Sequence, residues 1–154
     1  RFDENDVRSM GRVSRGVRGM KLAAKQQVIA LLVAGDETQT VLTATENGYG
    51  KRTPITEYTR HGRGTQGIIA IQTSERNGKV VAATLVTTED EIMLIGTNGV
   101  LIRTRVSEIR EMGRTTQGVT LINLGKGETL AGLSRIAEQE DEGVEVSESE
   151  EEHE

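Results

Sequence analysis

Three arginines that each follow a glycine recur with a constant spacing of 51 residues: Arg12, Arg63 and Arg114. Each lies in a segment of the form Gly-Arg, two residues, Arg or Gln, Gly, apolar residue. A guanidinium group binds phosphate oxygens through a planar set of N–H donors. Backbone N–H groups of glycine-rich loops can contact phosphates as well. The pattern therefore predicts anion binding at three equivalent positions.

Further cations lie close to these arginines in the sequence and are expected to enlarge the same surface. Evenly repeated arginines on a curved rim suit the phosphates of duplex DNA, which carry no sequence information. The aromatic residues are only Phe2, Tyr49 and Tyr58, which argues against a module that stacks bases. The predicted DNA-binding residues are Arg12, Arg15, Arg18, Lys21, Arg60, Arg63, Arg105, Arg110 and Arg114.

The same arginines have a purely structural alternative. The acids Asp6, Glu57 and Glu108 precede them at a constant distance, so each pair could form an ion pair within one repeat. Both glycines of each copy are predicted to adopt backbone angles closed to L-residues. Replacing all three arginines by Glu separates the hypotheses: loss of DNA binding by a folded chain supports the first, and unfolding supports the second.

Residues suited to catalysis are scarce. The histidines are His61 and His153, and cysteine is absent. His61 stands where the other copies have Met10 and Met112, which favours a packing role. The segment 62–67 has no Lys-Ser/Thr end and is not expected to open a helix, so no nucleotide loop is predicted. We therefore expect no active site, metal or cofactor in this segment.

Short β-strands are the elements expected to position the loops. The pair Asn47-Gly48 recurs as Asn98-Gly99, and Asn-Gly is a strong hairpin signal because both turn residues need positive φ. The stretch 22–32 holds helix formers, but its match to the strand at 80–86 favours β there too. About four strands per 51-residue period predict an all-β, propeller-like array. In the middle copy we expect strands at 49–53, 68–73, 80–86 and 92–96, a loop at 54–67 and turns at 77–78 and 87–90.

Charge divides the chain into two parts. All 19 Lys and Arg lie in residues 1–136 with 14 Asp and Glu, whereas residues 137–154 hold the other 10 acids and neither Lys nor Arg. We predict about three blades at 1–136 that bind a polyanion, and an acidic disordered tail at 137–154. The tail serves either solubility or competition for the basic surface. In the second case, truncation after Ile136 tightens binding at low salt.

Two further expectations concern the whole protein. The longest apolar run, residues 28–34, is too short to span a membrane, and the absence of cysteine fits a cytoplasmic location. The first copy lacks the Asn-Gly turn and strand before Arg1, and the third copy stops near Ile136. We therefore expect the chain to be part of a longer protein.

Three segments closely resemble the C-terminal domain of the A subunit of bacterial DNA gyrase, which is a type IIA topoisomerase: VRSMGRVSRGVRGMKL, GTNGVLIRTRVSEIREMGRTTQGVTLINL and LSRIAEQED. The resemblance implies a β-pinwheel, a propeller-like disc whose blades exchange strands, of which this chain is the C-terminal half. It also implies a role in binding and wrapping duplex DNA. The family's Gln-Arg-Arg-Gly-Gly-Lys-Gly box is absent, and the segment 62–67 is only a degenerate relative of it.

The resemblance implies partners and chemistry that this segment does not hold. The parent enzyme would introduce negative supercoils as a heterotetramer of two gyrase A and two gyrase B subunits in the bacterial cytoplasm, associated with the nucleoid. ATP and Mg²⁺ would act on other domains, and no membrane contact is implied. The alternatives are the A subunit of topoisomerase IV, or a propeller whose rim binds an acidic protein partner.

Overall fold

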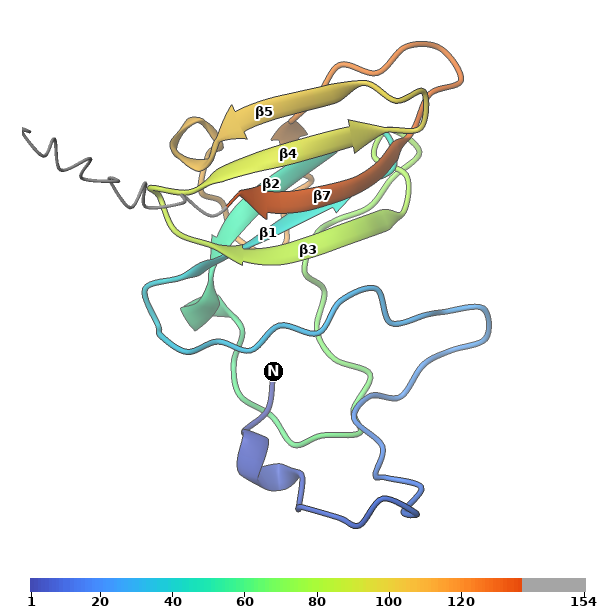
Figure 1. Ribbon diagram of the computed structural model, residues 1–154, viewed down its shortest axis with the longest axis vertical. Helices are drawn as coiled ribbons and strands as arrows, with labels where there is room; N and C mark the ends of the chain where they lie inside the picture. Colours follow the sequence, from blue (N-terminus) through green and yellow to red (C-terminus); the bar gives the residue numbers. More distant parts are fainter. Residues whose placement is uncertain (137–154) are drawn as a thin grey trace, which may run out of the picture.

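The structure, a computed structural model, describes residues 1–136. In this range the chain forms seven antiparallel strands and three single-turn 3-10 helices joined by long loops (Figure 1). The predicted acidic tail at 137–154 lies outside the described residues. The elements are η1 (Glu4–Asp6), β1 (Thr40–Thr45), β2 (Tyr49–Pro54), η2 (Ile55–Glu57), β3 (Val80–Val86), β4 (Glu91–Gly96), β5 (Leu101–Arg105), η3 (Val106–Glu108), β6 (Val119–Thr120) and β7 (Leu130–Ile136).

Each of the two sheets contains one hairpin. β1 pairs with β2 across the turn at Asn47-Gly48, and β4 pairs with β5 across the turn at Asn98-Gly99. Gly48 and Gly99 have φ of +85° and +81°, angles that a glycine adopts without steric cost. The hairpins predicted from the Asn-Gly pairs are confirmed, and they are equivalent units of the repeat.

Each hairpin is completed by strands from further along the chain. β3 pairs with β1, with Val86 opposite Thr40, and β7 pairs with β4, with Ile136 opposite Glu91. β6, from the following repeat, adds a short fourth strand beside β2. The sheet orders are therefore β3-β1-β2-β6 and β5-β4-β7. This exchange of strands between repeats confirms the predicted all-β, pinwheel-type fold.

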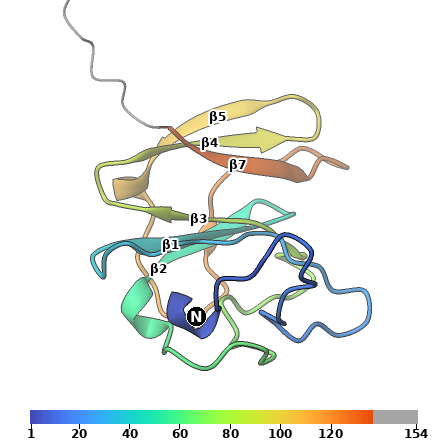
Figure 2. The ribbon, with the colours of Figure 1, turned by 60° about the horizontal axis from the view of Figure 1, so that its bottom comes forward.

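The core lies between the two sheets, which stack face to face (Figure 2). All six residues of β1 are buried, because this strand is central in its sheet, whereas β4 alternates and buries Ile92, Leu94 and Gly96. A fully buried Leu or Ile contributes about 1.5–3 kcal/mol relative to an exposed one. The buried apolar core residues of the described chain all lie between Val41 and Leu130, so the first repeat contributes none.

Two predicted strands are not formed. The segments 22–32 and 68–73 are irregular, and β6, the third-repeat counterpart of 68–73, is only two residues long. A strand needs a neighbour for its backbone N–H and C=O groups. Within the described residues, neither segment pairs with a strand of the two sheets, so neither has a ladder partner. The strand predictions at 49–53, 80–86 and 92–96 are confirmed.

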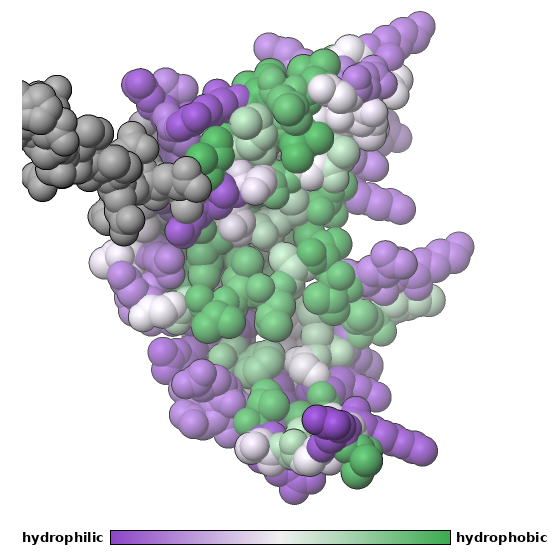
Figure 3. Space-filling model, viewed as in Figure 1, coloured by the Kyte–Doolittle hydropathy of each residue, from purple (hydrophilic) through white to green (hydrophobic). Residues whose placement is uncertain are grey.

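The unpaired segment 28–33 exposes apolar side chains to solvent. Leu31 is 85% exposed, Val33 77% and Val28 63%. Hydrophobic side chains extend along the middle of the molecular face shown in Figure 3, bordered by hydrophilic ones. None of the helices within residues 1–136 is long and apolar enough to cross a membrane.

Candidate nucleic-acid interface

The three Gly-Arg segments form three equivalent loops, each of which follows a 3-10 helix. The loops end at Gly16, Gly67 and Gly118, whose φ angles of +81°, +82° and +80° are nearly identical. A Cβ on Gly118 would lie 2.4 Å from the carbonyl oxygen of Gly50, so this position admits glycine only. The prediction of left-handed angles is confirmed for these glycines. It is wrong for the first glycine of each pair, which does not have positive φ.

Two of the three repeating arginines connect one repeat to the preceding one. Arg63 Nη1 donates to the backbone oxygen of Arg18 at 3.2 Å, and Arg114 Nη1 donates to that of Ile69 at 2.8 Å. Both bonds span 45 residues, so they are the same contact in successive repeats. Arg63 Nε also donates to the backbone oxygen of Asp6 at 3.0 Å. Backbone oxygens leave the positive charge of a guanidinium uncompensated, so these groups can still attract an anion.

The acids that precede the arginines do not pair with them. Among the described residues, Asp6, Glu57 and Glu108 take part in none of the ion pairs within 4.0 Å. Instead, Glu57 Oε2 accepts the backbone N–H of Arg114, in the following repeat, at 3.1 Å. The intra-repeat ion pair considered for these acids is therefore not formed, and Glu57 contacts the following repeat instead.

A second arginine, at the start of the first and second copies, also binds the next repeat. Arg1 Nη1 donates to the backbone oxygens of Ile55 at 3.0 Å and Tyr58 at 3.4 Å. Arg52 Nε donates to the backbone oxygen of Ile109 at 2.7 Å. The sequence shows that these arginines recur, but their structural role appears only when successive repeats are in contact.

The predicted DNA-binding residues differ in their availability. Arg60 pairs with Asp3 at 3.4 Å and Glu37 at 3.8 Å, and Arg105 pairs with Glu91 at 3.8 Å. Hydrogen bonds from Asn5, the backbone one foremost, lower the pKa of Asp3, so its carboxylate stays charged beside Arg60. Arg63 is exposed and forms no ion pair within residues 1–136, but its side chain donates hydrogen bonds to backbone oxygens. The predicted residues that are exposed and whose side chains form neither an ion pair nor a hydrogen bond within residues 1–136 are Arg12, Arg15, Arg18, Lys21 and Arg110.

Four of these free cations lie in one loop. We call residues 8–25 the basic loop; it also contains Arg8 and Lys25, which are not among the residues predicted from the sequence to bind DNA. The whole stretch 7–35 contains these six cations and no Asp or Glu. All six are exposed, and none forms an ion pair with any of the described residues. The absence of acids was the signal that could have identified Arg8 and Lys25.

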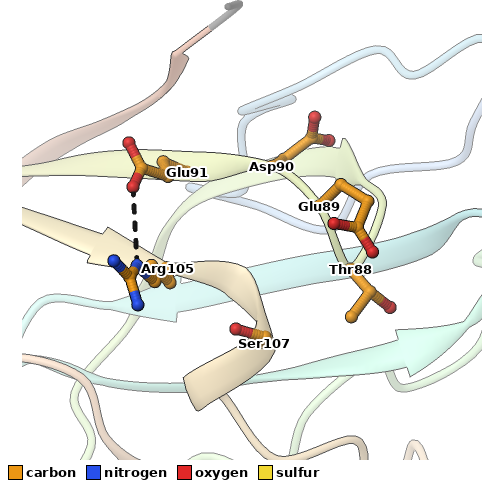
Figure 4. A pocket seen from close by; sticks show the side chains of 6 residues that line it. All are labelled: Thr88, Glu89, Asp90, Glu91, Arg105 and Ser107. Atoms are coloured by element: carbon orange, nitrogen blue, oxygen red, sulfur yellow. Dashed lines mark ion pairs between the residues drawn. The ribbon is translucent and has the colours of Figure 1, made fainter.

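A shallow pocket elsewhere has the opposite charge. Glu89, Asp90 and Glu91 line it together with one cation, Arg105, whose Nε lies 3.8 Å from Glu91 Oε1 (Figure 4). Three carboxylates around one guanidinium disfavour a phosphate. Within the described residues, no three His, Cys, Asp or Glu side chains form a group that could hold a metal ion. The basic loop is therefore the best candidate for binding an anionic ligand.

The fold and the basic loop define a class of protein: a propeller-type repeat domain whose successive units exchange strands and carry cationic loops. The sequence matches the family described as "DNA gyrase C-terminal domain, beta-propeller" over residues 1–34, 39–87 and 90–137. The chain belongs to this family. The three matched segments correspond to the three repeats.

Similar proteins are the A subunits of DNA gyrases. The chain is 56% identical to the DNA gyrase A protein of Neisseria gonorrhoeae over 143 residues, which cover 90% of this chain and 16% of the relative. It is 52% identical to the corresponding Pseudomonas aeruginosa protein, covering 97% of this chain and 17% of the relative. The chain thus spans about one sixth of the length of these relatives.

Solved structures agree with the family. A DNA gyrase A C-terminal domain superposes with a TM-score of 0.80 and 29% identity, covering 88% of this chain and 46% of that chain. The C-terminal domain of a DNA topoisomerase IV has a TM-score of 0.81 at 20% identity, covering 88% of this chain and 42% of that chain, which shows the shared fold. The gyrase domain is the closer of these two in sequence, so the comparison favours gyrase over topoisomerase IV.

Proposed function

We propose that this chain binds duplex DNA through the basic loop and supports DNA wrapping by a gyrase. The observation that carries the proposal is the six exposed cations of residues 8–25, which have no ion-pair partner among the described residues. Phosphate binding by such cations releases counterions, so the affinity falls steeply with salt and depends little on base sequence.

The remaining predicted cations have smaller or indirect parts in this proposal. Arg110 adds a free charge in the third repeat, while Arg60 and Arg105 are partly neutralised by their carboxylate partners. Arg63 and Arg114 hold backbone oxygens of the preceding repeat and present their remaining N–H groups. We therefore propose that the basic loop contributes most of the affinity for DNA. The arginine contacts between repeats determine the shape of the surface.

The experiment is a salt titration of duplex binding with two variants of equal charge. Replacing Arg12 and Arg15 by Gln is expected to weaken binding and to reduce the slope of log affinity against log salt by about 2, since about one phosphate contact is lost per residue. The control replaces Lys79 and Lys126 by Gln; both are exposed and lie outside the basic loop. Equal effects of the two variants would show that net charge alone binds DNA and would contradict the proposal.

The proposal extends to the whole protein through its family. The activity would be ATP-dependent negative supercoiling by an assembly of gyrase A and gyrase B proteins in the bacterial cytoplasm at the nucleoid. ATP and Mg²⁺ would act on parts of the enzyme outside this chain. A supercoiling assay with the reconstituted enzyme tests this, and the Arg12 and Arg15 variant is expected to relax DNA but to supercoil it poorly.

A protein-interaction role is the alternative that the same assays separate. An acidic protein partner would also bind the basic loop and would show a similar dependence on salt. Treatment with nuclease distinguishes the two, because contacts through DNA are lost and direct protein contacts remain. Failure of the wild-type chain to bind pure duplex DNA at low salt would overturn the DNA proposal.

A further inference from the structure

Lys51 is a fully buried lysine on β2, and its ammonium group lies against the third Gly-Arg loop. Its Nζ lies 2.5 Å from the backbone oxygen of Gly113, 2.6 Å from that of Arg114 and 3.0 Å from that of Thr116. The hydroxyl oxygen of Thr116 is a fourth acceptor at 3.1 Å. An ammonium group has three N–H donors, and burying it is costly unless each one finds an acceptor. Here the loop backbone supplies them all.

Glu57 holds the same loop from the other side. Its Oε2 accepts the backbone N–H of Arg114 at 3.1 Å. That N–H and the carbonyl oxygen of Gly113 belong to one peptide group, so the ammonium of Lys51 and the carboxylate of Glu57 bind its two ends. Hydrogen bonds to charged groups are stronger than neutral ones. This peptide group, and with it the start of the Arg114 side chain, is thereby fixed in orientation.

The contact is not part of the repeating pattern. The position equivalent to Lys51 in the next repeat is Ile102, which cannot donate a hydrogen bond from its side chain. The arginine contacts described above, by contrast, recur at both described junctions between repeats. Lys51 is therefore additional to the general architecture, and it acts on one loop only.

We propose that Lys51 is a positioning residue for DNA binding: it fixes the backbone of residues 113–116 so that Arg114 is presented to the duplex in one geometry. The inference rests on the proposed DNA-binding function. Lys51 cannot touch DNA itself, because it is buried, so it acts through the loop. A rigid loop binds more tightly than a mobile one because less conformational entropy is lost on binding.

The variant Lys51→Met in the full chain removes the charge and the donors but keeps an unbranched side chain. We expect faster amide exchange, measured by mass spectrometry, in the peptide that covers residues 110–118. The affinity for a random-sequence duplex at low salt should fall roughly two- to tenfold, which is what ordering one mobile loop side chain on binding costs. The midpoint of urea unfolding distinguishes weaker DNA binding from loss of the fold. Lys51→Met should shift this midpoint by no more than an ordinary substitution of a buried residue does.

Thr116→Val is a milder second variant in case Lys51→Met does not fold. It removes one of the four acceptors and also the hydrogen bond that the hydroxyl donates to the backbone oxygen of Gly113 at 2.9 Å. We expect a roughly two- to threefold loss of affinity, about what a weak hydrogen bond is worth. Its matched control is Thr115→Val at the neighbouring exposed position, which should bind DNA like the wild type.

A pH profile provides a measurement that general loosening would not change. Burial lowers the pKa of Lys51 to about 8, with Glu57 raising it and Arg114 lowering it further. Burial also raises the pKa of Tyr58 above its usual 10, so the phenol stays neutral between pH 7 and 9. A neutral amine has only two N–H donors for the four oxygen atoms and holds the loop less firmly. The ratio of the DNA affinity of the wild type to that of Lys51→Met should therefore shrink from pH 7 to pH 9.

The outcomes separate this inference from the proposed function. If the wild-type chain binds no duplex, the proposed function fails, and this inference fails with it. If the wild type binds and Lys51→Met binds equally well, only the positioning role is overturned, whatever the exchange of the loop amides. The positioning role is also overturned if the ratio of wild-type to Lys51→Met affinity stays constant between pH 7 and pH 9. Weaker binding with a pH-dependent ratio and an intact urea transition supports it.

Discussion

The guanidinium of Arg114 donates a 2.8 Å hydrogen bond to the backbone oxygen of Ile69, 45 residues earlier in the chain. Arg63 makes the equivalent bond to Arg18. The most regular charged residue of the repeat therefore has a structural task in addition to any contact with DNA. Because each such bond links two repeats, the loop surface of one repeat depends on the presence of its neighbour.

The first prediction concerns this contact. Arg114→Met should lower the free energy of unfolding by about 1–2 kcal/mol, because the backbone oxygen of Ile69 loses a charged donor. Arg110→Met, at an exposed position without an ion pair in the described chain, should change it by less than about 0.5 kcal/mol. Urea titrations of both variants check this, and equal stabilities would show that the Arg114 contact contributes nothing.

The second prediction concerns the glycine that ends the third loop. Gly118→Ala should destabilise the chain by at least about 2 kcal/mol, because φ is +80° and the new Cβ would lie 2.4 Å from the backbone oxygen of Gly50. Gly132→Ala is the control, since a Cβ there meets nothing within 4 Å. Thermal unfolding measures the difference. Similar melting temperatures for the two variants would contradict the proposed clash.

The third prediction is a pH dependence of stability. Burial lowers the pKa of Lys51 from 10.5 to about 8, so between these values the unfolded chain binds more protons than the folded one. Stability contributed at this site must then rise as pH increases from 8 toward 10.5. The difference in unfolding free energy between wild type and Lys51→Met should grow in this window. Measurements below about pH 10 avoid the opposing titration of Tyr58, whose pKa is raised by burial. A constant or shrinking difference would contradict the lowered pKa.

The fourth prediction concerns the unpaired apolar segment. Leu31 and Val33 are 85% and 77% exposed, and exposed apolar chain with free backbone groups favours self-association. Replacing both by Ser should reduce association in light scattering and leave the melting temperature of the two sheets unchanged, because neither side chain contributes to the core. Replacing the buried residue Leu94 by Ser instead should unfold the chain, which provides the contrast.

Much of the local structure could be predicted from the sequence. The Asn98-Gly99 turn, the strand at 80–86 and the left-handed Gly118 each follow from local rules on backbone angles and apolar runs. The same rules failed at 22–32 and 68–73, where the apolar pattern suits a strand but no strand within the described residues pairs with it. Strand propensity is a local property, whereas strand formation depends on a partner that is distant in sequence.

The candidate site, too, could be predicted from the sequence only in part. The sequence identified four of the six cations of the basic loop, since the type and spacing of charged residues require no knowledge of the fold. It could not separate Arg12, which is exposed without an ion pair among residues 1–136, from Arg114, which holds the backbone oxygen of Ile69. Nor did it indicate that Lys51 is buried against a loop more than 60 residues away.

The sequence by itself determined the 51-residue period, the turns between strands, the family and the excess of positive charge in residues 1–136. Only the tertiary structure decided which repeat supplies each outer strand and which arginines remain available to a ligand. The physical reason is that turns and charge depend on residues close together in the chain. A hydrogen-bond partner such as Ile69 for Arg114 is chosen only when distant segments pack against one another.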